Sequence, residues 1–381
     1  MRFPEFSGEW EKNNLSKFSS KITKKNKGNV IQNVLCNSAN LGIIPQNDYF
    51  DRDIANADNT DSYYIIEQGD FVYNPRKSTA APYGPVNIYN GEKPGIISPL
   101  YLCFSVLNIS PSFLFYRFKS SVWHPYVYSH GDTGVRFDRV SIKDDVFFDM
   151  PIYTPTQNEQ EKIATLLSLI DERIATQNKI IEDLKKLKSA IIEKLYSDIK
   201  GREYSYRQIF EIVNERNKQL EYLNILSASQ EKGMVNREDL NLDIQFERSN
   251  INTYKIVKEG DYVIHLRSFQ GGFAFSDKHG VCSPAYTILR PNDLLEFRYL
   301  SYYFTSQRFI KSLIVVTYGI RDGRSINVEE WLDMKTIIPS KERQHHIVET
   351  IRNIENKIEN EEKYASCLSN QKQYLLHHLF I

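Results

Sequence analysis

Side chains able to do covalent or metal chemistry are few and widely spaced in this sequence. The four cysteines, which have no CxxC spacing, are Cys36, Cys103, Cys282 and Cys367. Neither a zinc cluster nor a disulfide framework is therefore indicated. The paired histidines at 345–346 and 377–378 and the acidic residues at 359–362 are typical of solvated helix faces. We predict no metal site and no catalytic cluster.

Sequence motifs for cofactor and nucleotide binding are also absent. A DNA methyltransferase needs a glycine-rich turn for S-adenosylmethionine and an NPPY-like loop that holds a flipped base. The nearest string, Asn74-Pro75-Arg76-Lys77, lacks the second proline and the aromatic ring. No GxxxxGK(S/T) phosphate-binding loop occurs in the sequence. We therefore expect the chain to be non-catalytic.

Composition and charge describe a globular protein without an overall electrostatic preference. Hydrophobic residues make up 41% and aromatic residues 13%, as expected for a chain that buries a core. The 48 Lys and Arg residues balance 48 Asp and Glu residues, whereas nucleic-acid binders are often basic. Any positively charged surface must therefore come from the placement of side chains. The N-terminus has no apolar signal core and no bilayer-length apolar run follows, so we expect a cytoplasmic protein.

The chain matches itself at a shift of 184 to 191 residues, which indicates a tandem duplication. The matched pairs are Gly69-Asp70 with Gly260-Asp261, Ser98-Pro99 with Ser283-Pro284, Tyr101 with Tyr286, Pro155 with Pro339, and Gln160 with Gln344. Small changes in the shift correspond to short insertions in loops. Two copies of one domain predict two related functions.

A long amphipathic helix is predicted after each copy, because apolar residues alternate by four and three as in a coiled coil. The apolar positions are Ile163, Leu167, Ile170, Ile174, Ile181, Leu184, Ile191 and Leu195, and then Ile347, Ile351, Ile354, Ile358, Ala365, Leu368, Leu375 and Leu379. Polar interruptions at Gln177 and Lys188 recur 184 residues later at Glu361 and Lys372. A helix of about 40 residues spans roughly 60 Å, longer than a domain of about 150 residues is wide. We expect the two helices to pair with each other.

Two globular halves, each followed by a long helix, resemble the specificity subunit of type I restriction-modification systems over the whole chain. The matching motifs are Arg2-Phe3-Pro4-Glu5-Phe6, Gly8-Glu9-Trp10, Pro155, Glu159-Gln160, Lys162-Ile163-Ala164, Leu167, Asp171, Ile174, Leu184, Lys188 and Leu195-Tyr196. The second helix departs from the pattern, with Arg343-Gln344 in place of Glu-Gln. Its partner-docking surface is therefore not expected to match that of the first helix.

The resemblance implies an α+β protein in which two homologous, mixed α/β target-recognition domains are joined by two long antiparallel coiled-coil helices. The expected segments are a first domain at 1–156, a first helix at 157–200, a second domain at 201–340 and a second helix at 341–381. Such a subunit is non-catalytic and reads a bipartite target in double-stranded DNA.

The resemblance also implies partner subunits. Two methyltransferase subunits would dock on the helices, at exposed positions such as Glu172 and Lys186, and methylate adenine in the target. An ATP-dependent restriction subunit would translocate and cut unmethylated DNA. S-adenosylmethionine, ATP and Mg would be used by these partners and not be bound by this chain.

Within such domains, we expect base-reading side chains in loops rich in Gly and Arg near the strand ends. The candidates are Arg76, Lys77, Ser78, Thr133, Arg136 and Arg139 in the first domain, and Arg267, Gln270, Tyr318, Arg321 and Arg324 in the second. Arg can donate two hydrogen bonds to guanine, Gln can pair with adenine, and Gly lets backbone amides approach phosphates. For each residue, the alternative is a solvent-exposed turn with incidental charge.

Two other functions stay open from the sequence. One is the specificity portion of a single-chain restriction enzyme, although the chain begins and ends on the repeat and leaves no room for methylase and nuclease segments. The other is a structural coiled-coil adaptor that binds only protein, which the zero net charge favours. An adaptor would show no sequence preference in a gel-shift assay.

Overall fold

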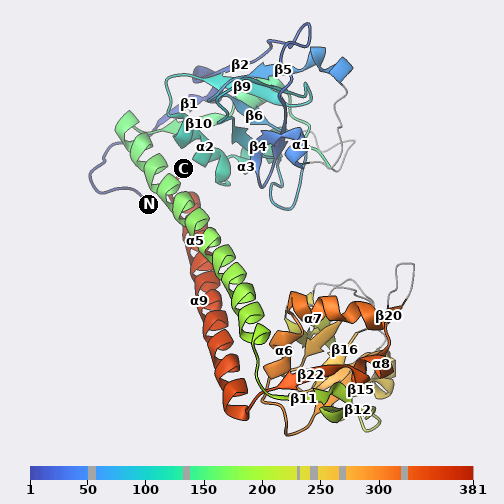
Figure 1. Ribbon diagram of the computed structural model, residues 1–381. Coiled ribbons are helices and arrows are strands. Elements are labelled where there is room, and N and C mark those ends of the chain that lie inside the picture. Colours follow the sequence, from blue (N-terminus) through green and yellow to red (C-terminus); the bar gives the residue numbers. More distant parts are fainter. Residues whose placement is uncertain are drawn as a thin grey trace. The chain divides into compact units, whose positions relative to one another are not determined.

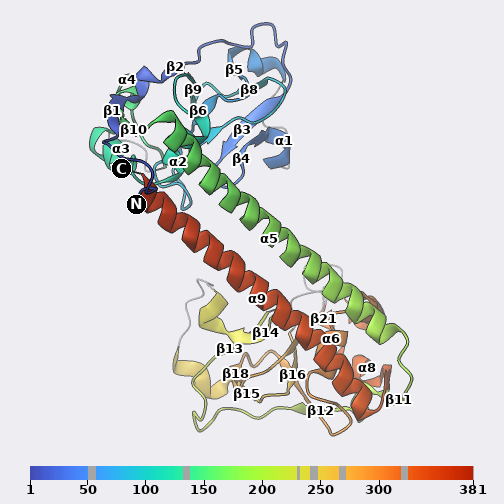
Figure 2. The ribbon, with the colours of Figure 1, turned by 90° about the vertical axis from the view of Figure 1, so that its left-hand side faces the viewer.

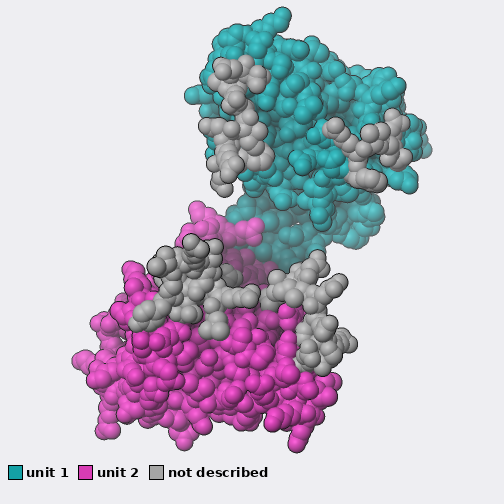
Figure 3. Space-filling model, turned by 90° about the vertical axis from the view of Figure 1, so that its right-hand side faces the viewer, with its two compact units in different colours: residues 1–177, 364–381 teal, residues 178–363 magenta. Residues whose placement is uncertain are grey.

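The computed structural model describes residues 1–49, 57–131, 138–229, 232–240, 248–265, 272–318 and 325–380. The chain divides into two compact units, residues 1–177 with 364–381 and residues 178–363 (Figure 3). Each unit contains one globular domain and parts of both long helices (Figures 1 and 2). Among the described residues, no helix is long and apolar enough to cross a membrane.

The first unit is built on two four-stranded sheets. One has the order β2-β9-β6-β7 and is antiparallel throughout, and the other has the order β4-β3-β8-β5 with β3 and β8 parallel. β1 and β10 form a separate antiparallel ribbon. The strands are β1 Glu11–Asn14, β2 Ser19–Lys21, β3 Val34–Ser38, β4 Gly42–Pro45, β5 Tyr64–Ile66, β6 Phe71–Tyr73, β7 Val86–Ile88, β8 Gly95–Ile97, β9 Leu102–Val106 and β10 Pro151–Thr154. The α-helices of this domain are α1 Gln46–Tyr49, α2 Pro111–Lys119, α3 His124–His130 and α4 Asp144–Phe148.

The second unit follows the same plan around the antiparallel sheet β12-β19-β16-β17. Two-stranded antiparallel pairs are β11-β22, β13-β14, β15-β18 and β20-β21. The strands are β11 Arg202–Ser205, β12 Phe210–Val213, β13 Leu226–Ser229, β14 Gly233–Asn236, β15 Lys255–Val257, β16 Tyr262–Ile264, β17 Phe273–Phe275, β18 Gly280–Cys282, β19 Thr287–Pro291, β20 Thr317–Tyr318, β21 Ser325–Ile326 and β22 Lys335–Ile338. The α-helices are α6 Tyr299–Tyr303, α7 Gln307–Ser312 and α8 Val328–Asp333.

Short 3-10 helices connect some of these elements, at Leu15–Lys17, Ala57–Ser62, Tyr206–Gln208, Arg237–Leu240, Arg248–Thr253 and Leu313–Val316. The two at Leu15–Lys17 and Tyr206–Gln208 each follow the first strand of their domain.

Strand pairing repeats between the two domains. β6 lies between β9 and β7 in the first sheet, and β16 lies between β19 and β17 in the corresponding sheet of the second unit. The parallel pairing of β3 with β8 recurs as a parallel bridge between Ile225 and Val281. The tandem duplication predicted from the sequence is therefore confirmed at the level of topology.

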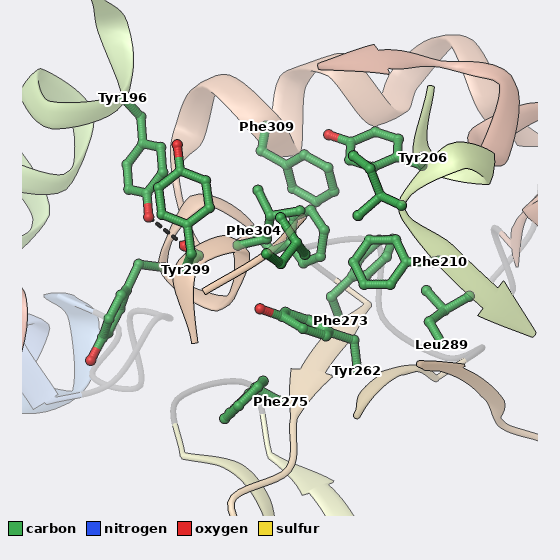
Figure 4. Packing of buried hydrophobic residues seen from close by; sticks show 14 of the residues in the cluster. Tyr196, Tyr206, Phe210, Tyr262, Phe273, Phe275, Leu289, Tyr299, Phe304 and Phe309 are labelled. Carbon is green, nitrogen blue, oxygen red and sulfur yellow. Dashed lines mark hydrogen bonds between the residues drawn. The ribbon is translucent and has the colours of Figure 1, made fainter. Parts of the chain in front are cut away.

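Aromatic side chains fill the core of each unit. In the first unit, Phe71 and Phe104 stack with 5.3 Å between ring centroids. In the second, Phe304 lies 4.7 Å from Phe273 and 4.4 Å from Phe309, centroid to centroid (Figure 4). Rings of this size bury much apolar surface. The loops of each domain are therefore attached to a rigid, well-packed core.

The two long helices are α5 Gln157–Ser197 and α9 Lys341–Leu379. In each unit, the first part of one helix is grouped with the last part of the other. Ion pairs join the helices within each unit: Lys185 Nζ lies 2.7 Å from Glu362 Oε1, and Lys372 pairs with Asp171. The helices therefore run antiparallel, as expected.

Most predicted apolar positions on the helices are buried, notably Ile163, Leu167, Ile170, Ile181, Ile347, Ile351, Ile358, Leu368 and Leu379. The prediction is wrong by one residue near the carboxyl ends, where Ile192 and Leu376 are buried and Ile191 and Leu375 are only partly buried. An α-helix drifts relative to a strict seven-residue repeat. The ends also pack into domain cores, since Ile192 joins the aromatic cluster of the second unit and Leu376 that of the first.

Candidate nucleic-acid interface

Two of the predicted loops of the first unit lie side by side. Residues 76–78 follow strand β6, and a backbone bridge pairs Arg76 antiparallel with Arg139. The backbone N–H of Lys77 donates to the carbonyl oxygen of Asp138 at 2.8 Å. These contacts bring Arg139 beside Arg76, Lys77 and Ser78, and all four were predicted to contact DNA.

A groove in this unit is lined by all four, Arg76, Lys77, Ser78 and Arg139. Its other lining residues include Gln46, Tyr49, Tyr63, Asn74, Ser98 and Tyr101. Arg76 and Lys77 are exposed and make no ion pair with a carboxylate in the described part of the chain, and Arg139 Nε lies 3.9 Å from Asp138 Oδ2. Positive charge beside polar and aromatic side chains suits contact with phosphates and base edges.

Two lining residues of the groove were not predicted from the sequence. Within the described residues, Gln46 has a buried Oε1 without a hydrogen-bond partner, and a Gln amide is a group that reads adenine. Burial raises the pKa of the Tyr101 hydroxyl, which keeps it protonated as a hydrogen-bond donor. The signals available in the sequence were the strand end before Gln46 and the recurrence of Tyr101 as Tyr286.

At two equivalent positions, the second unit keeps one side chain and changes the other. At the repeat shift, Tyr286 corresponds to Tyr101, and His265 corresponds to Asn74. The rings of His265 and Tyr286 lie 6.1 Å apart, and burial lowers the pKa of His265. A retained tyrosine beside a changed neighbour is what two related but non-identical reading sites require.

Several predicted contact residues, Thr133, Arg136, Arg267, Gln270, Arg321 and Arg324, lie outside the described residues. The backbone of Tyr318 is described and pairs with that of Ser325, as part of the ribbon β20-β21.

Comparisons with known proteins agree on one family. Residues 202–366 match the type I restriction modification DNA specificity domain. The type I restriction enzyme MjaVIII specificity subunit of Methanocaldococcus jannaschii is 26% identical over 315 residues, which cover 75% of this chain and 70% of that protein. The chain is thus similar to specificity subunits of type I restriction-modification systems. Subunits of this family recognise DNA sequence and are non-catalytic.

Solved structures share the fold of this chain. A structure from a study of complex assembly and conformational transition of the type I R-M system has a TM-score of 0.63 at 14% identity, covering 98% of this chain and 97% of that one. The HsdS subunit from Thermoanaerobacter tengcongensis has a TM-score of 0.52 at 15% identity, with 98% and 97% coverage. The S subunit from M. genitalium has a TM-score of 0.52 at 14% identity, with 100% and 99% coverage. These likenesses confirm the expected fold of two mixed α/β domains with two long helices.

The motif Pro155-x-x-x-Glu159-Gln160 stands at the start of α5, and its glutamine has a structural role in this protein. Gln160 is buried at the start of α5, accepts a hydrogen bond from the N–H of Ser110 at 2.9 Å and donates to the carbonyl of Pro155 at 3.0 Å. Gln344 repeats this role at the start of α9, where it accepts from the N–H of Glu296 at 2.7 Å. Each glutamine therefore ties a helix start to a loop of its own domain.

The glutamate of the same motif explains why the two helices differ in sequence. Glu159 is fully buried and receives two hydrogen bonds from Arg2, at 2.8 Å from Nε and 2.7 Å from Nη2. Such bidentate pairs are strong and directional. Nearby, Lys162 forms an ion pair with Glu5, so the segment at 1–10 packs on the start of α5. The equivalent position in α9 is Arg343, which is exposed.

The two residues proposed for partner docking, Glu172 and Lys186, are both exposed on α5. Lys186 Nζ lies 2.6 Å from Glu182 Oε1 one turn earlier, and this contact lowers the pKa of the Glu182 carboxyl. The histidines at 345–346 and 377–378 are exposed as well. In the described ranges, no three His, Cys, Asp or Glu side chains are grouped so that they could hold a metal ion.

Proposed function

We propose that this subunit reads a bipartite target in double-stranded DNA, with one half-site for each recognition domain. The observation that carries this proposal is the duplication. One topology recurs, and a residue of the first unit's groove, Asn74, is replaced at the equivalent position of the second unit by His265. The proposed recognition domains are residues 1–156 and 201–340. Residues proposed to contact DNA are Arg76, Lys77, Ser78, Thr133, Arg136 and Arg139 in the first domain and Arg267, Gln270, Tyr318, Arg321 and Arg324 in the second.

We further propose that two methyltransferase subunits dock on the outer faces of the helices at 157–200 and 341–381. Glu172 and Lys186 are candidates for this contact because both are exposed on α5. The docked subunits would methylate adenine with S-adenosylmethionine. A restriction subunit would use ATP and Mg to translocate and cut unmethylated DNA, and the specificity subunit would bind none of these cofactors.

The proposal is tested by expressing the chain with its methyltransferase partner in cells without other methylation, and mapping methylated adenines by long-read sequencing. A motif of two half-sites separated by a fixed gap is expected only when both proteins are present. Methylation by the chain alone, or the same motif from the partner alone, would contradict the proposal.

A further inference from the structure

A tyrosine, a carboxylate and a lysine join three separate elements in the first unit. Tyr116 of α2 donates a hydrogen bond from its hydroxyl to Asp171 Oδ2 of α5 at 2.9 Å. Lys372 of α9 forms an ion pair with the other oxygen, Asp171 Oδ1. The Lys372 ammonium also lies over the Tyr116 ring, 5.9 Å from its centroid. Both carboxylate oxygens are thus engaged, each by a different element.

The second unit contains an equivalent cluster with the helix roles exchanged. Tyr302 of α6 donates to Glu355 Oε2 of α9 at 2.7 Å, and Lys188 of α5 lies 3.4 Å from Glu355 Oε1. Arg298 Nη1 approaches the same carboxylate at 3.9 Å. The carboxylate is therefore on α5 in one cluster and on α9 in the other.

These clusters account for two polar interruptions in otherwise apolar helix faces. Lys188 and Lys372 are 184 residues apart, and so are Asp171 and Glu355. A polar residue on a coiled-coil seam costs stability, and its recognised use is to set register and orientation. Both repeats keep the lysine, and each lysine pairs with a carboxylate on the opposite helix. This pattern indicates that the register of the two helices is set at these contacts.

The tyrosines extend this effect from the helices to the domains. Tyr116 is 5% and Tyr302 6% exposed, and each belongs to the aromatic core of its own domain. Apolar packing is non-directional and tolerates sliding or rotation of a domain against a helix. A hydrogen bond to one oxygen of a carboxylate whose other oxygen is held by lysine is directional. Each cluster therefore restricts the position of its domain on the helices as well as the register of the two helices.

We propose that the two Tyr-carboxylate-Lys clusters are positioning devices that fix how each recognition domain sits on the helix pair, and thereby the gap between half-sites that the complex accepts. This inference rests on the proposed bipartite function. The six residues contact one another and are not among those proposed to contact DNA. They would act through the placement of the domains, and so set gap selectivity and leave half-site sequence preference unchanged.

The test is a library of targets whose gap differs from the natural one by one base pair in either direction, methylated by the full chain with its methyltransferase partner. One base pair changes the separation by about 3.4 Å and the rotation by roughly 35°. Tyr302→Phe and Asp171→Asn are expected to raise methylation at the altered gaps several-fold relative to the natural gap. The half-site sequences should stay the same.

Two further variants and a melting curve make the result decisive. Asp171→Glu supplies the carboxylate that the second cluster uses and should keep the parent's gap selectivity. Lys363→Met removes an exposed α9 ion pair, 2.7 Å from Glu359, and should leave selectivity unaltered. A lower melting temperature with unchanged gap selectivity in both Tyr302→Phe and Asp171→Asn would mean a structural role only and would overturn the inference. Absence of any bipartite motif with the parent chain would instead contradict the proposed function.

Discussion

Lys119 gives a prediction whose sign and size follow from its surroundings. It lies at the end of α2 in the first unit, and its Nζ donates to Asn87 Oδ1 at 2.5 Å. Burial lowers the pKa of the Lys119 ammonium to about 8, and the nearby charge of Lys372 lowers it further while Asp171 opposes this. The folded protein therefore holds this proton less tightly than the unfolded chain does.

The change from an ordinary pKa of 10.5 to about 8 corresponds to on the order of 3 kcal/mol of unfolding free energy at neutral pH. This contribution destabilises the folded state, because folding lowers the proton affinity of Lys119 while the group still carries its proton at neutral pH. This cost to the free energy of unfolding is complete below pH 8 and disappears as the pH rises through 10.5. Lys119 therefore makes the folded protein more stable as the pH rises across that window.

Lys119→Met removes the titrating group, and urea unfolding at pH 7, 8.5 and 10 measures the difference between variant and parent. Other titrations are common to both proteins and cancel. At pH 7 the variant should be the more stable by on the order of 2 kcal/mol, after about 1 kcal/mol is subtracted for the lost hydrogen bond to Asn87. The advantage should shrink by roughly 2 to 3 kcal/mol by pH 10. A difference that is flat or grows with pH would refute the reasoning.

Other predictions address the helix pair, the groove and the helix starts. Leu167→Ala, at a fully buried position, should cost about 2–5 kcal/mol in chemical denaturation, whereas Leu169→Ala, 57% exposed on the same helix, should cost less than about 0.5 kcal/mol; equal costs would argue against the buried helix face. Arg76→Ala should weaken methylation at one half-site by about 1–3 kcal/mol and relax one base position if the side chain pairs with guanine, while a uniform loss over all sequences would make it a phosphate contact. Glu159→Gln should lower the melting temperature measurably and the equivalent Arg343→Gln should not, because only Glu159 is buried against Arg2.

Much of the architecture could be predicted from periodicity and self-similarity. The repeat predicted two domains of one topology, because a fold survives sequence divergence when its strand and turn positions keep their order. The four-three spacing predicted the helix pair, since a helix longer than its domain must bury its apolar face on another helix. At the carboxyl ends of the helices, the spacing predicted the buried position one residue too early. The residues that are buried there, Ile192 and Leu376, pack into domain cores, to which the coiled-coil repeat does not apply.

The candidate interface could be predicted only in part. Arg76 and Arg139 were recognisable as charged loop residues, but their juxtaposition depends on a backbone bridge between segments 63 positions apart. Gln46 enters the same groove from a short helix after β4, and no local pattern indicates that its carbonyl stays without a partner among the described residues. Lys188 and Lys372 looked like interruptions of a seam, because their carboxylate and tyrosine partners come from other elements.

The most direct test of the central claim is replacement of residues 201–340 by the equivalent domain of a relative, with the methylome mapped in the presence of the methyltransferase partner. Each domain has its own core, so recognition should be modular. The account predicts that one half of the methylated motif changes to that of the relative, while the other half-site and the gap stay as they were. A change in both half-sites, or in neither, would contradict it.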